Sequence, residues 1–159
     1  MNHTITILEG PDGSGKSTLA KRQDKHSSYI HGGSKRDTVS EQIDCAVAQL
    51  RAAAQLAKWE PVTIDRSVLS IIAYECALGN YEELKENEAK LKSAVREMNK
   101  YRVIICLPTK AKWLEVFKRE KTVKGEFYTS EEFMGCVYDE FKKLLDANPE
   151  YERYNYCNN

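Results

Sequence analysis

The chain has 159 residues, the usual size of one domain with a hydrophobic core of its own. Its 24 Lys and Arg residues balance 24 Asp and Glu residues, so the formal net charge at pH 7 is zero. Proteins that hold nucleic-acid polymers usually carry a basic surplus. The balance therefore argues against a nucleic-acid polymer as partner and favours a small anionic ligand.

Cysteine usage and the first residues indicate the compartment. The five cysteines are widely spaced and never form a C-x-x-C pair, so neither a disulfide framework nor a zinc site is predicted. The opening MNHTITILEG lacks the basic and apolar segments of a signal peptide, and no run reaches the roughly 18 apolar residues of a membrane span. We expect a soluble, cytoplasmic protein with no membrane partner.

Five segments predict strands, in chain order 5–8, 27–31, 61–64, 102–106 and 151–157. The first, third and fourth (ITIL, PVTI and RVIIC) are short runs rich in β-branched residues and lack strict alternation. Such runs are typical of strands in a parallel sheet that is covered on both faces. The last segment is polar enough to be an edge strand.

Helical patterns lie between these strands. Capping-box pairs predict helix starts at Thr38 with Glu41, at Asn80 with Glu83 and at Thr129 with Glu132. Thr109 is expected to cap a shorter helix that buries Trp113 and Phe117, and Trp59 is expected to anchor a helix end against the sheet.

The alternation of strands and helices implies right-handed βαβ crossovers. The sequence therefore predicts an α/β fold over a single domain, 1–159, with a doubly wound, five-stranded parallel sheet and helices on both faces. Ligands of such sheets bind beyond the carboxyl ends of the strands.

Residues 8–18 read LEGPDGSGKST and match the P-loop pattern G-x-x-x-x-G-K-[ST] at Gly10, Gly15, Lys16 and Ser17. A predicted strand precedes the pattern and a helix follows it, which is the context that the motif requires. Backbone N–H groups and the helix N-terminus can bind phosphate, Lys16 can reach the β- and γ-phosphates, and the Ser17 hydroxyl can ligate Mg²⁺. This predicts a P-loop NTPase fold that binds ATP with Mg²⁺. The expected ATP-binding residues are Gly10, Asp12, Gly13, Ser14, Gly15, Lys16, Ser17 and Thr18.

The P-loop alone does not distinguish motors, switches and kinases. The segment 63–75, TIDRSVLSIIAYE, does distinguish them, because together with the P-loop it resembles the thymidylate kinase family. Members carry E-G-x-D-x-x-G-K-[ST] and D-R-x-x-x-S-x-x-A-[YF], matched here in the second motif by Asp65, Arg66, Ser70, Ala73 and Tyr74. The chain is most similar to short bacteriophage members, in which a YIH stretch also occurs.

The resemblance implies a role for each matching residue. Arg66 would bind the acceptor monophosphate, and Asp65 would position Mg²⁺ or its waters. Asp12 would meet the 3′-hydroxyl of the acceptor sugar, Tyr74 would lie under that sugar, and Ser70 would belong to the same acceptor site. Independently, two phosphate groups that approach each other repel, so a nucleotide kinase needs an arginine on the acceptor as well as a lysine on the donor. The alternative is a local ion pair between Asp65 and Arg66 at the end of a strand.

A basic segment, FKREKTVKGEFY, follows the fourth strand and predicts a short lid over about 118–128. In nucleotide kinases such a lid excludes water and neutralises the transferring phosphoryl group. Of its basic residues we favour Arg119 as catalytic, together with Lys16, Asp65 and Arg66. The alternative for any single lysine is a solvated basic helix end.

These patterns predict a phosphotransferase that moves the γ-phosphoryl group of ATP to dTMP or a related deoxynucleoside monophosphate. The helix before Asp65 lacks the phenylalanine that family members use to stack on thymine, so the base remains open. Two alternatives remain: a P-loop kinase that phosphorylates the hydroxyl of a nucleoside or of a polynucleotide 5′ end, and a nucleotide-binding module without transfer activity.

A homodimer is also expected, since 68–78 is apolar nearly all round. A phage-encoded chain would act in the host cytoplasm.

Overall fold

A computed structural model describes residues 2–23, 27–32, 38–124 and 130–158, and five strands form one sheet. The strands are β1 (Ile5–Glu9), β2 (Ser28–His31), β3 (Val62–Asp65), β4 (Arg102–Cys106) and β5 (Glu152–Tyr154). Their order across the sheet is β2-β3-β1-β4-β5, and every neighbouring pair is parallel. The predicted five-stranded parallel α/β sheet is confirmed, with β5 as a short edge strand.

Seven α-helices and a final 3₁₀ turn are present in the described part of the chain. They are α1 (Lys16–Arg22), α2 (Val39–Leu56), α3 (Val68–Leu78), α4 (Tyr81–Glu86), α5 (Glu88–Met98), α6 (Lys110–Lys124), α7 (Glu131–Ala147) and η1 (Tyr156–Asn158). None of these described helices is both long and apolar enough to cross a membrane.

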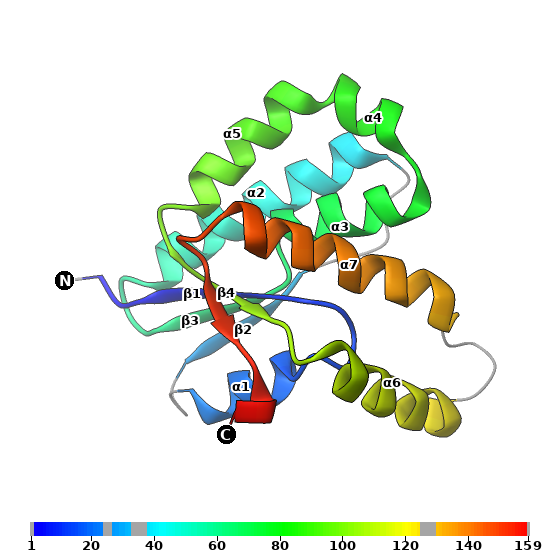
Figure 1. The fold of residues 1–159 in the computed structure, drawn as a ribbon. Coiled ribbons are helices and arrows are strands. Elements are labelled where there is room, and N and C mark those ends of the chain that lie inside the picture. Colours follow the sequence, from blue (N-terminus) through cyan, green and yellow to red (C-terminus); the bar gives the residue numbers. More distant parts are fainter. Residues whose placement is uncertain (1, 24–26, 33–37, 125–129, 159) are drawn as a thin grey trace.

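Helices cover both faces of the sheet, as predicted, but unequally. From β1 the chain first moves to the outer strand β2, and every later connection moves in the opposite direction across the sheet. Right-handed crossovers therefore place the helix of the first connection, α1, on one face and the main helices of the later connections on the other. Figure 1 shows α1 on one side of the sheet and α2, α3, α5 and α7 on the other. The large core lies under those four helices, and a small cluster of Leu8, Ile104 and Cys106 lies under α1.

The predicted helix starts are partly right. The Thr38 hydroxyl accepts a hydrogen bond from the Glu41 N–H and caps α2, as the capping box predicts. Helix α7 is capped instead by Ser130, one residue after the predicted Thr129, which lies outside the described residues. Helix α6 has 15 residues and is longer than predicted.

The helix predicted from Asn80 divides at Asn87 into α4 and α5. Neither member of the predicted Asn80–Glu83 pair caps α4 through its side chain. The Asn80 amide donates to Glu75, and Glu83 Oε1 accepts from the Val39 N–H at 2.7 Å, at the start of α2. Tertiary partners therefore replace the local cap.

One surface prediction is wrong, and the basis of a second one changes. Trp59 does not anchor a helix against the sheet, because 81% of its surface is exposed. Most of the apolar surface of α3 is covered within the chain, since α3 packs against α2, α4, α5 and α7, whereas Leu78 at its end is 57% exposed. Its composition therefore does not by itself require a partner chain.

Candidate active site

The P-loop connects β1 to α1 at the carboxyl edge of the sheet, where α1 and α3 leave from adjacent strands toward opposite faces. This is the topological switch point at which α/β sheets bind ligands. Gly10, Gly13 and Gly15 all have positive φ, of 145°, 76° and 89°. A Cβ atom at Gly10 would lie 2.4 Å from the Cys106 carbonyl oxygen, so only glycine fits beside β4.

Lys16 is buried and folds back over this loop. Its Nζ donates to the carbonyl oxygens of Gly10 and Pro11, each at 2.9 Å, and to Ser14 Oγ at 3.4 Å. Burial and the nearby Arg66 lower the pKa of Lys16 to about 8, against the opposing effect of Asp65 and Asp12. The ammonium group therefore lies where a further negative charge would stabilise it.

Arg66 follows β3 and reaches the same loop. Its Nη1 donates to the Gly10 carbonyl at 3.1 Å, and its Nη2 forms an ion pair with Asp12. The guanidinium carbon lies 5.1 Å from the centre of the Tyr74 ring. Burial lowers the pKa of Arg66, but the phenol of Tyr74 and the carboxylate of Asp12 outweigh it, so the pKa is raised. The alternative prediction was an ion pair between Arg66 and Asp65. Arg66 instead forms its ion pair with Asp12.

Asp65 ends β3 as a buried carboxylate with 3% of the residue surface exposed. Its Oδ2 accepts a hydrogen bond from the Tyr29 hydroxyl, and His31 Nδ1 lies 3.7 Å away. Its Oδ1 is buried and has no hydrogen-bond partner among the described residues. Ser17, the other predicted Mg²⁺ ligand, lines the same cavity as Asp65.

These donors fit Mg²⁺. Mg²⁺ binds oxygen, keeps several waters, and usually takes only one or two carboxylates besides substrate phosphates. An unpartnered carboxylate oxygen of Asp65, in a cavity that Ser17 also lines, meets that requirement. In the described part of the chain, no group of three or more His, Cys, Asp or Glu side chains forms an all-protein metal site.

Glu9 is a residue of the site that the sequence did not single out. It is fully buried, accepts from the Ser67 N–H at 2.6 Å, and also accepts from the Ser70 hydroxyl. Burial raises its pKa, although the Ser70 hydroxyl and the charge of Arg66 oppose this. Ser70, predicted to bind the acceptor, is buried between Glu9 and Arg66, so its link to a ligand runs through Arg66. The sequence did contain a signal for Glu9, which is a charged residue at the end of an apolar strand. A charge buried there needs hydrogen-bonding partners, and such partners are often part of a site.

The predicted lid is largely helical. Residues 118–124 form the last turns of α6, and 125–128 lie outside the described residues. Helix α6 lies against the P-loop, since a Cβ atom at Gly13 would meet Val116 at 3.7 Å. Arg119 lines the same cavity as the P-loop, whereas Lys118 pairs with Glu131.

A cavity of about 540 Å³ opens at this edge of the sheet. The predicted residues that line it are Asp12, Gly13, Ser14, Gly15, Lys16, Ser17, Thr18, Asp65, Arg66 and Arg119. Gly10, Ser70 and Tyr74 are not among its lining residues, although all three contact Arg66. Tyr154 and Tyr156, which the sequence did not single out, also line the cavity, beside Gly15.

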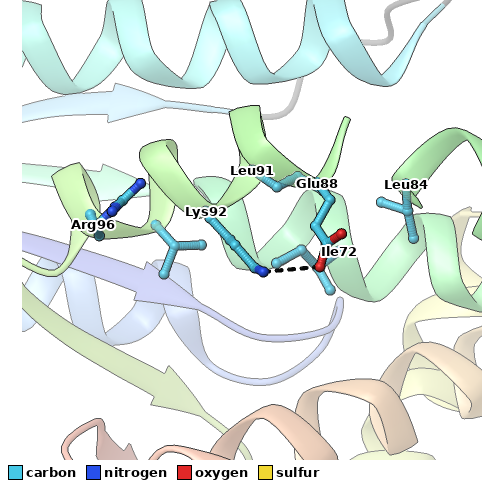
Figure 2. A pocket seen from close by; sticks show the side chains of 7 residues that line it. Ile72, Leu84, Glu88, Leu91, Lys92 and Arg96 are labelled. Carbon is cyan, nitrogen blue, oxygen red and sulfur yellow. Dashed lines mark ion pairs between the residues drawn. The ribbon is translucent and has the colours of Figure 1, made fainter. Parts of the chain in front are cut away.

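A second cavity, of about 410 Å³, is separate from the first and shares none of its lining residues. Side chains of α3, α4 and α5 line it, among them Ile72, Leu84 and Leu91, and Figure 2 shows the ion pair of Lys92 with Glu88 beside them. Its lining is mainly apolar, and it carries none of the predicted site residues.

No protein-family model and no curated protein matches the chain. Solved structures do match it. The YorR protein of Bacillus subtilis, in complex with phosphorylated GDP, has 21% identity and a TM-score of 0.65, with 96% of this chain and 85% of that chain covered. Deoxyadenosine kinase of M. mycoides with bound dATP has 13% identity and a TM-score of 0.62, covering 98% and 90%. Thymidylate kinase of Candida albicans has 12% identity and a TM-score of 0.57, covering 97% and 84%. The chain therefore has the fold of the P-loop nucleoside and nucleotide kinases.

Proposed function

We propose that the chain is an ATP-dependent deoxynucleoside monophosphate kinase that transfers the γ-phosphoryl group of ATP to dTMP or a related monophosphate. The observation that carries this proposal is the meeting of Lys16 and Arg66 on one acceptor, the Gly10 carbonyl, at 2.9 and 3.1 Å. Two cations held this close repel, and each lies where an anion would be bound. Lys16 would then bind the donor phosphates and Arg66 the acceptor phosphate.

In this reaction an acceptor phosphate oxygen attacks the γ-phosphorus in line. A bond forms from that oxygen to the phosphorus, the bond to the β-phosphate oxygen breaks, and ADP leaves. No covalent intermediate is needed, because positioning and charge neutralisation supply the catalysis. Arg66 would keep its contact with Asp12 and bind the acceptor phosphate through other N–H groups of the guanidinium, and the Asp12 carboxylate would also accept from the acceptor sugar.

Ser17 and Asp65 would hold Mg²⁺ at the phosphate end of the cavity. When bound, the ion would neutralise charge on the β- and γ-phosphate oxygens. Arg119 would add a cation from α6, which lines the same cavity. The side chain of Tyr74, which packs under Arg66, would support the sugar of the acceptor.

The test is a coupled assay for ADP formation with Mg²⁺, ATP and each of dTMP, dUMP, dGMP, dCMP and dAMP. At least one of these monophosphates should be turned over, and the base that is preferred identifies the acceptor. Lys16→Ala is the control for contaminating kinases, and its preparation should be inactive. Absence of turnover with all five monophosphates contradicts the proposal.

A second candidate is a kinase that phosphorylates a hydroxyl group. The observation in its favour is the buried Asp65 carboxylate, whose Oδ1 lacks a partner among the described residues and could accept a hydroxyl proton. Deoxynucleosides and an oligonucleotide with a free 5′-hydroxyl, run in the same assay, distinguish it. Binding of ATP without turnover of any acceptor would indicate a non-catalytic nucleotide-binding module.

We also propose that the chain forms a homodimer in the cytoplasm, or in the host cytoplasm if it is phage-encoded. The apolar cavity between α3 and α5 offers a surface for a second copy (Figure 2). Glu88, Lys92 and Arg96 lie four residues apart on one face of α5, acidic at one end and basic at the other. In an antiparallel, two-fold pairing of α5 helices, Glu88 faces the partner's Arg96.

A further inference from the structure

Trp113 is a buried tryptophan on the first turns of α6, with 1% of its surface exposed. Its ring stacks on Phe117 at a centroid distance of 5.4 Å and packs on Tyr138 of α7 at 5.1 Å. Such packing explains a core tryptophan, but it does not explain where the polar indole N–H is directed. That group donates to the carbonyl oxygen of Asp12, at 2.7 Å, in the P-loop.

The bond continues a series along the P-loop. The carbonyls of Gly10 and Pro11 accept hydrogen bonds from Lys16, and the next carbonyl, that of Asp12, accepts from Trp113. The residue after Asp12, Gly13, has a φ of 76°, so the chain turns sharply there. The indole therefore holds the backbone at the turn from which the Asp12 side chain extends.

The Asp12 carboxylate in turn pairs with Arg66. Asp12 is thus held at its carbonyl by the helix α6 and at its carboxylate by the residue that follows β3. We propose that Trp113 is a positioning residue, which fixes Asp12 and, through it, the guanidinium of Arg66, so that α6, the P-loop and Arg66 keep one relative arrangement. This inference rests on the proposed function only where it treats Arg66 as the arginine of the acceptor site.

Trp113→Phe tests the proposal, because it keeps an aromatic ring and removes the N–H. Loss of a buried hydrogen bond that positions a charged pair should raise the KM for the acceptor about tenfold. The dissociation constant for ATP should change by less than about threefold, because the bonds of Lys16 to Gly10 and Pro11 and the N-terminus of α1 remain when the indole N–H is removed. Tyr138→Phe is the matched control, since Tyr138 lies in the same aromatic cluster and donates to Pro108, outside the P-loop. Both variants should lose thermal stability, and only Trp113→Phe should change the acceptor KM.

A replacement with the same shape as tryptophan covers the case in which Trp113→Phe fails to fold. In a Trp59→Phe background, position 113 is the remaining tryptophan and can be replaced globally by 3-benzothienylalanine, which has the shape of indole and lacks the N–H. Trp59 is largely exposed, so its own replacement should be neutral. The analogue should reproduce the acceptor KM of Trp113→Phe at nearly wild-type stability. An acceptor KM equal to that of the parent overturns the proposal.

Fluorescence separates this inference from the proposed function. In the Trp59→Phe background the emission reports Trp113 alone, and Arg66→Ala should shift that emission because it releases Asp12. Arg22→Ala is the control, since Arg22 lines the same cavity and bonds to Tyr154 instead. A shift with Arg66→Ala in a protein without kinase activity supports the coupling and rejects the function. Unchanged emission in an active kinase rejects the coupling alone.

Discussion

At the residue scale, Arg66 is held in an unfavourable backbone conformation. Its φ of 72° is the one positive value for a non-glycine residue in the described part of the chain. The left-handed region costs an L-residue roughly 1 kcal/mol. The Arg66 N–H donates to the Leu8 carbonyl at 2.9 Å, which holds the backbone there, and the side chain is directed at Gly10 and Asp12. A strained residue with a specific charge partner is a candidate for a functional role.

Replacing Arg66 separates its strain from its charge. Arg66→Ala should lower kcat/KM for the acceptor by about 100-fold, because a charge-assisted contact to phosphate is lost, and should leave ATP affinity nearly unchanged. Arg66→Gly should be equally impaired but about 1 kcal/mol more stable than Arg66→Ala, because glycine adopts positive φ freely. Steady-state kinetics and urea unfolding measure the two effects. An unchanged acceptor KM in both variants contradicts the assignment of Arg66.

Lys16 makes the stability depend on pH. Its pKa is about 8 in the folded chain and 10.5 as the ordinary value, so the unfolded state binds more protons between these pH values. The free energy of unfolding should therefore rise from about pH 8 to about pH 10.5, whereas below pH 8 the cost of burying the ammonium is fully present. Lys16→Met should remove this rise, because methionine does not titrate. Urea unfolding as a function of pH measures both effects, and a flat profile in the parent chain contradicts them.

At the element scale, β2 and β3 meet so closely that their ends limit the side chains allowed. The Gly32 N–H donates to the Asp65 carbonyl at 2.7 Å, just after β2. A Cβ atom at Gly32 would lie 2.2 Å from the Arg66 carbonyl oxygen, which is backbone and has no rotamer to change. The close approach explains why a glycine follows His31, where the sequence indicated only a turn.

Gly32→Ala should destabilise the chain by about 1–3 kcal/mol and raise the acceptor KM, because the displaced backbone carries Arg66. Gly135→Ala is the matched control. Gly135 lies inside α7 with nothing within 4 Å of its added Cβ atom, so the change should stabilise by about 0.5–1 kcal/mol. Thermal unfolding and kinetics of both variants are the measurements. A Gly32→Ala protein as stable as the parent would contradict the claim that the close approach to the Arg66 carbonyl excludes a side chain here.

Element types were predictable where the signal was local. The runs that became β1, β3 and β4 are short, apolar and β-branched, and their positions agree with the structure to within a residue. The division of one predicted helix into α4 and α5 was not predictable, because the side chains of Asn80 and Glu83 bond to Glu75 and Val39 rather than to their own helix. Competition between local capping and tertiary partners decides such boundaries.

At the scale of the whole molecule, the apolar cavity and the charges on α5 predict self-association. Light scattering after size exclusion should give twice the mass of one chain. Arg96→Glu should shift the protein to monomer, since it places like charges opposite each other. The double change Glu88→Arg with Arg96→Glu should restore the dimer, because it reverses both partners of each pair. A parent chain that is monomeric at all concentrations contradicts the dimer without bearing on the kinase activity.

The sequence by itself determined the parts that depend on neighbours in the chain. Glycine spacing, a lysine and a serine between a strand and a helix are enough to predict a phosphate-binding loop, because that loop is built from consecutive residues. The sequence likewise predicted that Asp65 and Arg66 follow a strand, and both line the cavity at the carboxyl edge of the sheet.

Only the tertiary structure decided which side chains meet. Arg66 pairs with Asp12 rather than with its neighbour Asp65, Ser70 turns to Glu9, and Trp113 reaches the carbonyl of Asp12. These partners lie 54, 61 and 101 positions apart in the chain, and their proximity follows from the order of β1, β3 and β4 in the sheet. Side-chain charge and hydrogen-bonding capacity belong to the sequence, whereas partner choice follows from strand order, which decides which distant groups are buried together.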